Sequence, residues 1–436
     1  MTSKNRTFMG ALCLAAIGAA AGTADADHAS VSVDGARIQQ HITQLSRFGA
    51  NPEGGVSRVA FSEADIGGRE YVKKLMEEAG LVVRVDAAGN IIGRIDGSDP
   101  RLPVIMIGSH IDSVPGGGNY DGNVGVLGSI EVARTLHAGG VRLRHSLEVV
   151  SFTDEEGGLI GSLSMSGRLE PAALDVKSDS GHLIRDGIRA VGGDPHRLEQ
   201  ARRPSGELKA FIELHVEQGA VLEESRTDIG VVEGIVGIRW WDVTIEGTAN
   251  HAGTTPMNRR QDALVSAAQL VLAVNKVATT LEGTQVATVG KIRVEPGAYN
   301  VVPGRVVMGL EIRDLADDKI EAVFELIRAE AAQIAKSRGT PIHFNDLQLA
   351  SYAAPTNQAI RDVIARAAKT RGLTYKLMPS GAGHDAQEMA HIAPIGMIFV
   401  PSVGGISHSP RERTTEQDMK NGANVLLQTV LTLDQD

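Results

Sequence analysis

The first half of the chain alternates short apolar runs with segments that have one apolar face. Ser62 and Asp65 have the spacing of a helix N-terminus, and apolar positions then recur on one face as far as Gly80, which predicts a helix. Residues 81–95 alternate apolar and polar positions around a turn and predict a β-hairpin. A second helix is predicted over 131–140. Apolar runs typical of buried strands lie at 103–109, 145–152 and 210–217.

The pattern changes near residue 236. Two long amphipathic segments, 262–281 and 318–337, predict helices, and they are interleaved with segments that alternate in the way of half-exposed strands. Those strand segments lie at 237–247, 287–297, 305–315 and 340–346. The order strand-helix-strand-strand-helix-strand predicts a compact α+β unit inserted at about 236–345.

The flanking segments, 27–235 and 346–436, are predicted to form one α/β domain. Strands that alternate with helices favour a mixed, mostly parallel central sheet flanked by helices. The chain returns to this pattern after the insertion and ends in a helix predicted near 415–433.

The N-terminus has the order of a secretory signal. Lys4 and Arg6 precede an apolar stretch that is too short to span a membrane, and Ala24-Asp25-Ala26 resembles a cleavage site. We therefore predict that residues 1–26 are a signal peptide and that the mature protein is periplasmic or secreted, with no membrane association. Cleavage would remove Cys13, the only cysteine, so cysteine chemistry and disulfides are not expected.

Composition narrows the function classes. The 42% hydrophobic and 22% charged content is that of an ordinary globular protein. A formal net charge of −10, with no block of lysines and arginines, predicts that nucleic acid is not a partner.

The stretch GSHIDSVPGGGNYDG, residues 108–122, places polar groups directly after a buried strand. His110 lies at the carboxyl end of that strand, where ligands collect in open α/β sheets. Asp112 is close enough in sequence to orient His110, as carboxylates do for metal-bound histidines. The glycines allow the backbone to turn and to bring Asp121 back toward His110.

Four further stretches place polar groups after apolar runs. They contain Glu155 and Glu156, His215 and Gln218, His384, and His408. One of two adjacent glutamates can bind a metal while the other acts as a general base. Histidine, aspartate and glutamate at one sheet edge form a ligand set for two divalent ions that share the aspartate. Zinc suits these nitrogen and oxygen ligands best, although manganese, cobalt and nickel also fit them.

With these motifs the chain resembles the amidase/hydantoinase/carbamoylase branch of the dinuclear metallohydrolases related to the M20 peptidases. That branch includes N-carbamoyl-L-amino acid amidohydrolases and allantoate amidohydrolases. Eight blocks match in order between residues 35 and 433: GSHIDS…NYDG, FTDEEGG, ELHVEQG, ANHAGTTPMNRRQDA, PGAYNVVPG, EIRD, SGAGHDA and SHSP. One departure is Gly116, at a position where the family commonly has asparagine.

The resemblance implies roles for these residues. Glu155 would be the general base and Asp112 would orient His110. The metal ligands would be His110, Asp121, Glu156, His215 and His408, with Asp121 shared between two ions. The residues facing the substrate would be Gln218, His251, Asn300, Arg313, Gly381, Ala382 and Gly383. The inserted domain would be a lid through which two chains dimerise, and His251, also a catalytic residue, would reach the partner's site with Asn300.

Residues outside these blocks are predicted to have ordinary structural roles. Trp240 and Trp241 are expected to pack the sheet of the lid. The remaining histidines considered ordinary are His137, His145, His182, His196, His343 and His391.

The resemblance implies metal-dependent hydrolysis of a linear ureido C–N bond rather than a peptide bond. An N-carbamoyl-L-amino acid is the leading substrate, with amino acid, ammonia and carbon dioxide as products, and allantoate is the alternative. Two further alternatives are an exopeptidase or deacylase of the wider M20 group, and a secreted binding protein that has lost catalysis. Glu155 discriminates against the last, because a degenerate relative should lose the base or a ligand.

Overall fold

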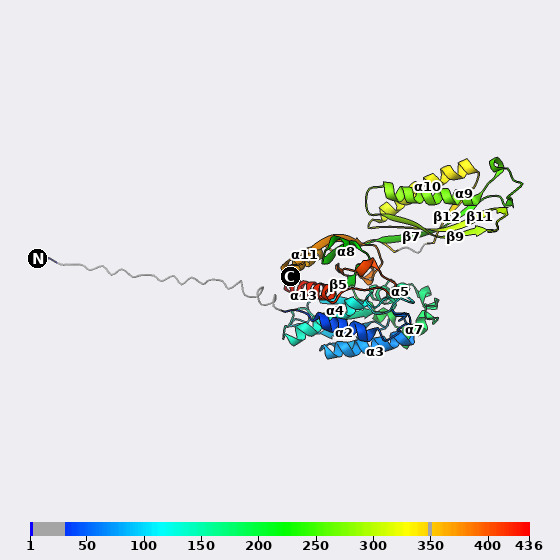
Figure 1. Cartoon of the computed structure of the whole chain (residues 1–436). Coiled ribbons are helices and arrows are strands. Elements are labelled where there is room, and N and C mark those ends of the chain that lie inside the picture. The colour runs from blue at the N-terminus through cyan, green and yellow to red at the C-terminus, as the bar shows by residue number, and fades with distance from the viewer. Residues whose placement is uncertain (3–30, 348–350) are drawn as a thin grey trace.

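The computed structural model describes residues 1, 2, 31–347 and 351–436 (Figure 1). The predicted signal peptide therefore lies almost wholly outside the described residues. The described chain forms a main α/β body and a smaller lid that stands apart from it in Figure 1.

The main body is built on a nine-stranded sheet with parallel strands at its centre. The strands in spatial order are β1 (Val82–Val85), β2 (Ile91–Ile95), β4 (Leu147–Phe152), β3 (Val104–His110), β5 (Leu208–Val216), β15 (Ile395–Val400), β6 (Ile229–Ile235) and β13 (Ala354–Pro355), and β14 (Tyr375–Ser380) pairs with β6. β4, β3, β5 and β15 run parallel, while antiparallel pairs lie toward both ends. This arrangement confirms the predicted mixed, mostly parallel sheet.

Helices cover both faces of this sheet. The longer ones pack on one face: α2 (Gly35–Leu45), α3 (Glu63–Glu78), α4 (Asn123–Ala138), α11 (Gln358–Thr370) and α13 (Glu416–Gln435). Shorter helices are α5 (Glu155–Gly158), α6 (Ile160–Ser166), α7 (Ile184–Ala190), α8 (Val221–Ser225) and α12 (Asp385–Met389). The second core, on the opposite face, contains Met165 of α6 and Met389 of α12. Both faces are thus buried, which explains why the central strands are continuously apolar.

Two local predictions can be compared with the helices. α3 begins as predicted, because the Ser62 hydroxyl accepts the N–H of Asp65 at 3.2 Å. The predicted start of the next helix is wrong: α4 begins at Asn123, not near residue 131. Its first half is buried on all sides and so lacks an amphipathic period, and a Cβ on Gly125 would lie 2.2 Å from the carbonyl oxygen of Leu214.

The lid has the predicted order of elements and a core of its own. Its antiparallel sheet has the order β12 (Ile342–Asp346), β7 (Gly237–Glu246), β11 (Arg305–Asp314) and β9 (Val286–Glu295). The helices α9 (Ala263–Thr280) and α10 (Asp317–Arg338) lie on one side of that sheet (Figure 1). A short ladder pairs β8 (Asn250–His251) with β10 (Val301–Val302).

α9 is long and apolar enough to cross a membrane by length and composition alone. It lies instead along the lid sheet, where Ala267, Leu270 and Val274 are buried in the lid core. This packing accounts for the apolar character of its inner face.

Candidate metal centre

The predicted ligands meet at the carboxyl ends of the parallel strands. His110 is the last residue of β3, and His215 lies near the end of β5. Glu155 and Glu156 form the start of α5, just after β4. Parallel strands end at the same edge of a sheet, so segments far apart in sequence deliver these side chains to one place.

Asp121 lies at the centre of the cluster. Its Oδ1 is 3.1 Å from Nε2 of His215 and 3.6 Å from Nε2 of His110. Its Oδ2 is 3.2 Å from Nε2 of His408, and the same His408 nitrogen is 3.4 Å from Oε2 of Glu156. The two oxygens of one carboxylate therefore face two separate groups of possible metal ligands.

Glycine allows the chain to turn tightly at this point. Gly122 has φ +63, and a Cβ there would lie 2.5 Å from the His110 ring. Gly116 also has a positive φ, +68, but open space surrounds it. Asparagine tolerates this left-handed conformation better than most residues, so glycine in place of the family's asparagine is compatible with the same loop shape.

Backbone carbonyls orient the two buried histidines. Nδ1 of His215 donates to the carbonyl oxygen of Val216 at 2.9 Å, and Nδ1 of His110 donates to that of Asp112 at 3.1 Å. A ring nitrogen beside a carbonyl must carry a proton, so Nε2 of each ring, which faces Asp121, is the nitrogen that would bind a metal after giving up its own proton.

Asp112 contacts His110 through its backbone and not, as predicted, through its carboxylate. It orients His110 through its backbone carbonyl, while its nearest carboxylate oxygen is 3.7 Å from the ring Nδ1. The Asp112 carboxylate accepts the backbone N–H groups of Glu155 at 3.3 Å and Glu156 at 3.1 Å. It therefore fixes the start of α5 and, with it, both glutamates.

The buried carboxylates of the cluster need positive charge, which protons supply in this structure and a divalent ion could supply instead. Burial raises the pKa of Glu155 well above its usual range and that of Glu156 to about 7. Burial would also raise the pKa of Asp121, but hydrogen bonds from three histidines hold it well below its usual range. A hydrogen bond to Asp121 raises the pKa of His408 to about 9. Within the described residues, no lysine or arginine forms an ion pair with these carboxylates.

The donor set fits divalent metal ions. One group combines His110, Asp121 and His215, and another combines Asp121, Glu156 and His408; within each, the possible ligand atoms lie within 4.8 Å of one another. Imidazole nitrogens and carboxylate oxygens are the ligands that zinc prefers outside thiolate sites. The five predicted ligands could hold two ions with Asp121 between them.

His384 and its neighbours lie behind this cluster. The His384 ring packs edge-on against His215 with ring centroids 4.5 Å apart, and its Nε2 is hydrogen-bonded to the Ser380 hydroxyl at 2.8 Å. Asp385 and Glu213 are also buried here, and neither was predicted. Both lie within matched blocks, Glu213 in ELHVEQG and Asp385 in SGAGHDA, so the sequence offered a signal that was not used.

The cluster opens into a cavity of about 520 Å³. The predicted substrate-facing residues that line it are Gln218, Arg313, Ala382 and Gly383. Nη1 of Arg313 donates to the carbonyl oxygen of Gly381 at 2.7 Å, and Nε2 of Gln218 donates to Oδ2 of Asp121 at 2.7 Å. Of the three lid residues predicted to face the substrate, Arg313 alone lines this cavity.

The two tryptophans have different surroundings. Trp241 is 3% exposed and stacks on Phe324 in the lid core, as predicted. The prediction for Trp240 is wrong, because it is 37% exposed and lines the cavity, with its Nε1 donating to Glu311 at 2.5 Å. Adjacent residues of a strand point to opposite faces of the sheet, so only one of the pair can reach the core.

His251 and Asn300 lie together but away from the cluster. They belong to the β8–β10 region of the lid, where the N–H of Ala252 donates to the carbonyl oxygen of Asn300 at 2.9 Å. Both residues are exposed, and neither lines the cavity. Within one chain the structure does not bring them to the predicted ligands.

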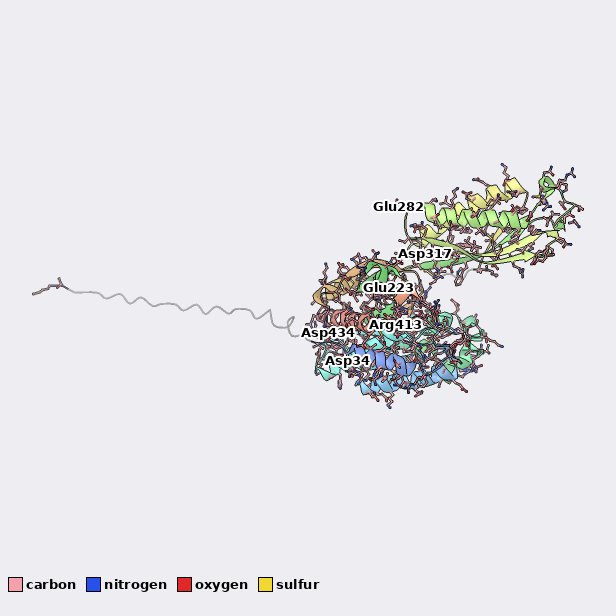
Figure 2. All side chains as sticks on the ribbon, viewed as in Figure 1. Asp34, Glu223, Glu282, Asp317, Arg413 and Asp434 are labelled. Carbon is pink, nitrogen blue, oxygen red and sulfur yellow. The ribbon has the colours of Figure 1, made fainter. Side chains whose placement is uncertain are left out.

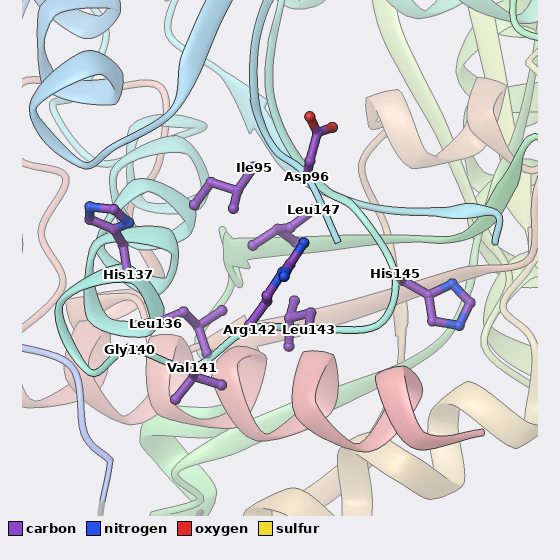
Figure 3. A pocket seen from close by; sticks show the side chains of 10 residues that line it. All are labelled: Ile95, Asp96, Leu136, His137, Gly140, Val141, Arg142, Leu143, His145 and Leu147. Atoms are coloured by element: carbon purple, nitrogen blue, oxygen red, sulfur yellow. The ribbon is translucent and has the colours of Figure 1, made fainter. Parts of the chain in front are cut away.

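A separate cavity of about 370 Å³ contains none of the predicted site residues (Figure 3). His137 and His145 line it, together with apolar residues such as Leu136 and Leu147. Nδ1 of His145 donates to the carbonyl oxygen of Pro103 at 2.6 Å. This bond to the backbone agrees with an ordinary structural role for His145.

Comparison with known proteins places this geometry in a family. The model of peptidase family M20/M25/M40 matches residues 106–432. The chain belongs to this family. Both the resemblance drawn from its motifs and the predicted fold class are thereby confirmed.

Relatives in the M20 family have closely similar lengths. An N-carbamoyl-L-amino acid amidohydrolase from Geobacillus stearothermophilus is 43% identical over 410 residues, covering 92% of this chain and 99% of that protein. An allantoate amidohydrolase from Escherichia coli is 34% identical, covering 89% and 95%. The crystal structure of a hydantoinase/carbamoylase-family amidase from Burkholderia multivorans is 35% identical with a TM-score of 0.86, covering 93% and 99%. These similarities support an enzyme that acts on ureido amides.

Proposed function

We propose that this M20-family chain uses two divalent ions to hydrolyse the linear ureido C–N bond of N-carbamoyl-L-amino acids. The products would be the amino acid, ammonia and carbon dioxide. The observation that carries the proposal is the position of Asp121, whose two oxygens face separate histidine-containing groups near the half-buried Glu155. The similarity to an N-carbamoyl-L-amino acid amidohydrolase supports the substrate class.

The ions would be held by the five predicted ligands, and zinc is proposed ahead of manganese, cobalt and nickel. Bound ions would act as Lewis acids toward the ureido carbonyl and lower the pKa of water. His110 and His215 lie near one carboxylate oxygen of Asp121 and would bind one ion with it. Glu156 and His408 lie near the other oxygen and would bind the second ion.

Glu155 is proposed as the general base. Its Oε2 lies 3.7 Å from Nε2 of His110, and the residue lines the cavity into which the substrate would fit. Asp112 holds its backbone in place. Glu155 would accept a proton from the attacking water and deliver it to the leaving nitrogen.

Arg313 is proposed to bind the substrate carboxylate. A guanidinium can make two parallel hydrogen bonds to a carboxylate. In this structure Arg313 makes them to Glu311, at 2.8 and 3.1 Å, so a substrate carboxylate would have to replace Glu311. Arg313 also borders a second cavity of about 930 Å³, whose lining includes the apolar Val221, Leu377 and Met378 as well as the charged Glu217, Glu233 and Lys376. The side chain of the substrate could extend into this space while its ureido group lies near Asp121. Gln218 and the loop from Gly381 to Gly383 would complete the contacts.

The active form is proposed to be a homodimer joined through the lid. β9 lies at an edge of the lid sheet, and its Val286 and Ile292 are each 51% exposed. Leu264 and Leu272 of α9 are also exposed. An open sheet edge beside exposed apolar residues is a suitable surface for a second copy of the chain. His251 and Asn300 would then reach the metal centre of the partner subunit.

Export is proposed from the N-terminal sequence alone. Residues 1–26 have the order of a signal peptide, and cleavage after Ala26 would release a mature periplasmic or secreted enzyme. Mass spectrometry of the native protein should find an N-terminus at or near Asp27.

Allantoate is the second candidate substrate, favoured by the similarity to an allantoate amidohydrolase. With zinc-loaded protein, ammonia release should be measured on N-carbamoyl-L-amino acids and allantoate, and release of free amino acid on N-acetyl-L-amino acids and dipeptides. The proposal expects kcat/KM to be highest for one or more N-carbamoyl-L-amino acids. Preference for allantoate would select the alternative, whereas turnover of only acetyl or peptide substrates would contradict ureido hydrolysis.

A further inference from the structure

Glu412 is a buried carboxylate in an otherwise exposed, charged stretch. It is 5% exposed, whereas its neighbours Arg411 and Arg413 are exposed (Figure 2 labels Arg413). Glu412 makes no ion pair with a lysine or arginine in the part of the chain that the structure describes. A carboxylate buried in this way needs hydrogen-bond donors, and it finds them on two different loops.

One oxygen of Glu412 holds the loop that carries Asp121. Its Oε2 accepts the backbone N–H of Tyr120 at 2.8 Å and that of Asp121 at 3.1 Å. A Cβ on Gly118 would lie 2.0 Å from the same oxygen. Gly118 has no positive φ, so the position of Glu412, and not backbone conformation, leaves room only for glycine there.

The other oxygen holds the loop that carries His408. Oε1 of Glu412 accepts the hydroxyl of Ser407 at 2.7 Å, and the backbone N–H of Glu412 donates to the carbonyl oxygen of Ser409 at 3.0 Å. His408, between these two serines, has φ +50, an uncommon conformation for a residue other than glycine that its surroundings must hold in place.

The Ser407 hydroxyl links Glu412 to the predicted ligands themselves. It lies 3.0 Å from Oδ2 of Asp121, the oxygen that faces His408. A hydroxyl has one hydrogen, so it can donate to Glu412 or to Asp121 but not to both at once. While Glu412 accepts that hydrogen, the Ser407 hydroxyl does not compete with a cation for Oδ2 of Asp121, which then accepts only the Nε2–H of Gln218 from the uncharged side chains near it.

We propose that Glu412 is a positioning residue that sets the affinity of the metal ion at the Glu156–His408 end of the centre. This inference rests on the proposed function. Glu412 joins the Asp121 loop to the His408 loop and contacts neither His110 nor His215. Its loss should therefore weaken one ion more than the other.

The test uses Zn²⁺ titrated by calorimetry into the full-length protein stripped with a chelator. The wild-type chain should bind two ions. Glu412→Gln keeps an oxygen that accepts the two N–H groups, but its amide N–H₂ would turn the Ser407 hydrogen toward Asp121. The ion at the Glu156–His408 end should therefore bind about 10–100-fold more weakly, while the affinity of the ion at the His110–His215 end should be unchanged. Gly118→Ala should have the same effect by displacing Glu412. Glu416→Gln, at an exposed glutamate nearby, is the matched control and should bind like the wild type.

The outcomes separate this inference from the proposed function. Two ions bound with wild-type affinity by both Glu412→Gln and Gly118→Ala would overturn the role of Glu412 alone. Equal weakening of both ions, together with a lower Tm of the metal-free variants, would show a general structural role and also overturn it. A wild-type chain that binds fewer than two ions would overturn the proposed function and this inference together.

Discussion

The main body and the lid contribute to the site in different ways. In the main body, the predicted ligands already converge around Asp121, because they follow parallel strands that end at one edge. In the lid, Arg313 lies beside the cavity, whereas His251 and Asn300 lie on an exposed part of the same domain. The proposed metal centre thus needs only one folded chain, whereas complete catalysis is proposed to need the lid of a second one.

Glu155→Gln tests the part of the site that one chain supplies. The amide cannot accept a proton from water, so kcat on the best ureido substrate should fall on the order of 10²–10⁴-fold. Zinc content by elemental analysis should stay at the wild-type value. Glu170→Gln, at an exposed glutamate, serves as the control. Turnover near that of the wild type would move the role of base to another residue.

His251→Ala tests the part that the partner is proposed to supply. Loss of one hydrogen bond to the developing oxyanion should lower kcat by about 10²–10³-fold, with metal content unchanged. His343→Ala, at another exposed histidine of the lid, should retain activity.

Mixing the two inactive variants sharpens the comparison further. A heterodimer of Glu155→Gln and His251→Ala chains would contain one site with both residues intact, so some activity should return. No recovery in a heterodimer verified by native mass spectrometry would show that each chain works alone.

Arg313→Ala should affect substrate binding more than turnover. Loss of a charged hydrogen-bonding partner should raise KM for carboxylated ureido substrates by roughly 10–100-fold, equivalent to about 1.5–3 kcal/mol. Arg293→Ala, at an exposed arginine of β9, is the control. An equal change in KM for a neutral urea would argue against recognition of a carboxylate.

Asp112→Asn should weaken metal binding, by a factor no larger than the change in KM expected for Arg313→Ala. Asparagine keeps the backbone carbonyl that orients His110, but its side chain replaces one acceptor of the Glu155 and Glu156 N–H groups with an amide donor. Zinc affinity should fall by about 10-fold, at the lower end of the range for such changes. Unchanged affinity and unchanged kcat together would mean that the Asp112 carboxylate does not help to position α5.

The sequence predicted the site residues best where they come directly after an apolar run that marks a strand. His110 and His215 could be placed because apolar runs marked β3 and β5, and Asp121 because glycines marked a return of the chain. Glu412 could not be found in this way, since its donors are backbone N–H groups on a loop distant in sequence. The start of α4 was missed because a helix buried on all sides has no polar face to mark its period.

The lid shows the same limit for single residues. Its order of strands and helices follows from alternation and amphipathic period, yet Trp240 and Trp241 could not be assigned to the two faces of β7 without the fold. The position of His251 relative to the centre depends on a second chain, which no pattern within one sequence fixes.

The central claim is that two divalent ions around Asp121 carry ureido hydrolysis. The most direct measurement is ammonia release from an N-carbamoyl-L-amino acid by metal-stripped protein as Zn²⁺ is added back, with bound zinc counted by elemental analysis. The account predicts no turnover in the stripped protein and full recovery at two zinc ions per chain. Full activity in protein verified to be metal-free would contradict it.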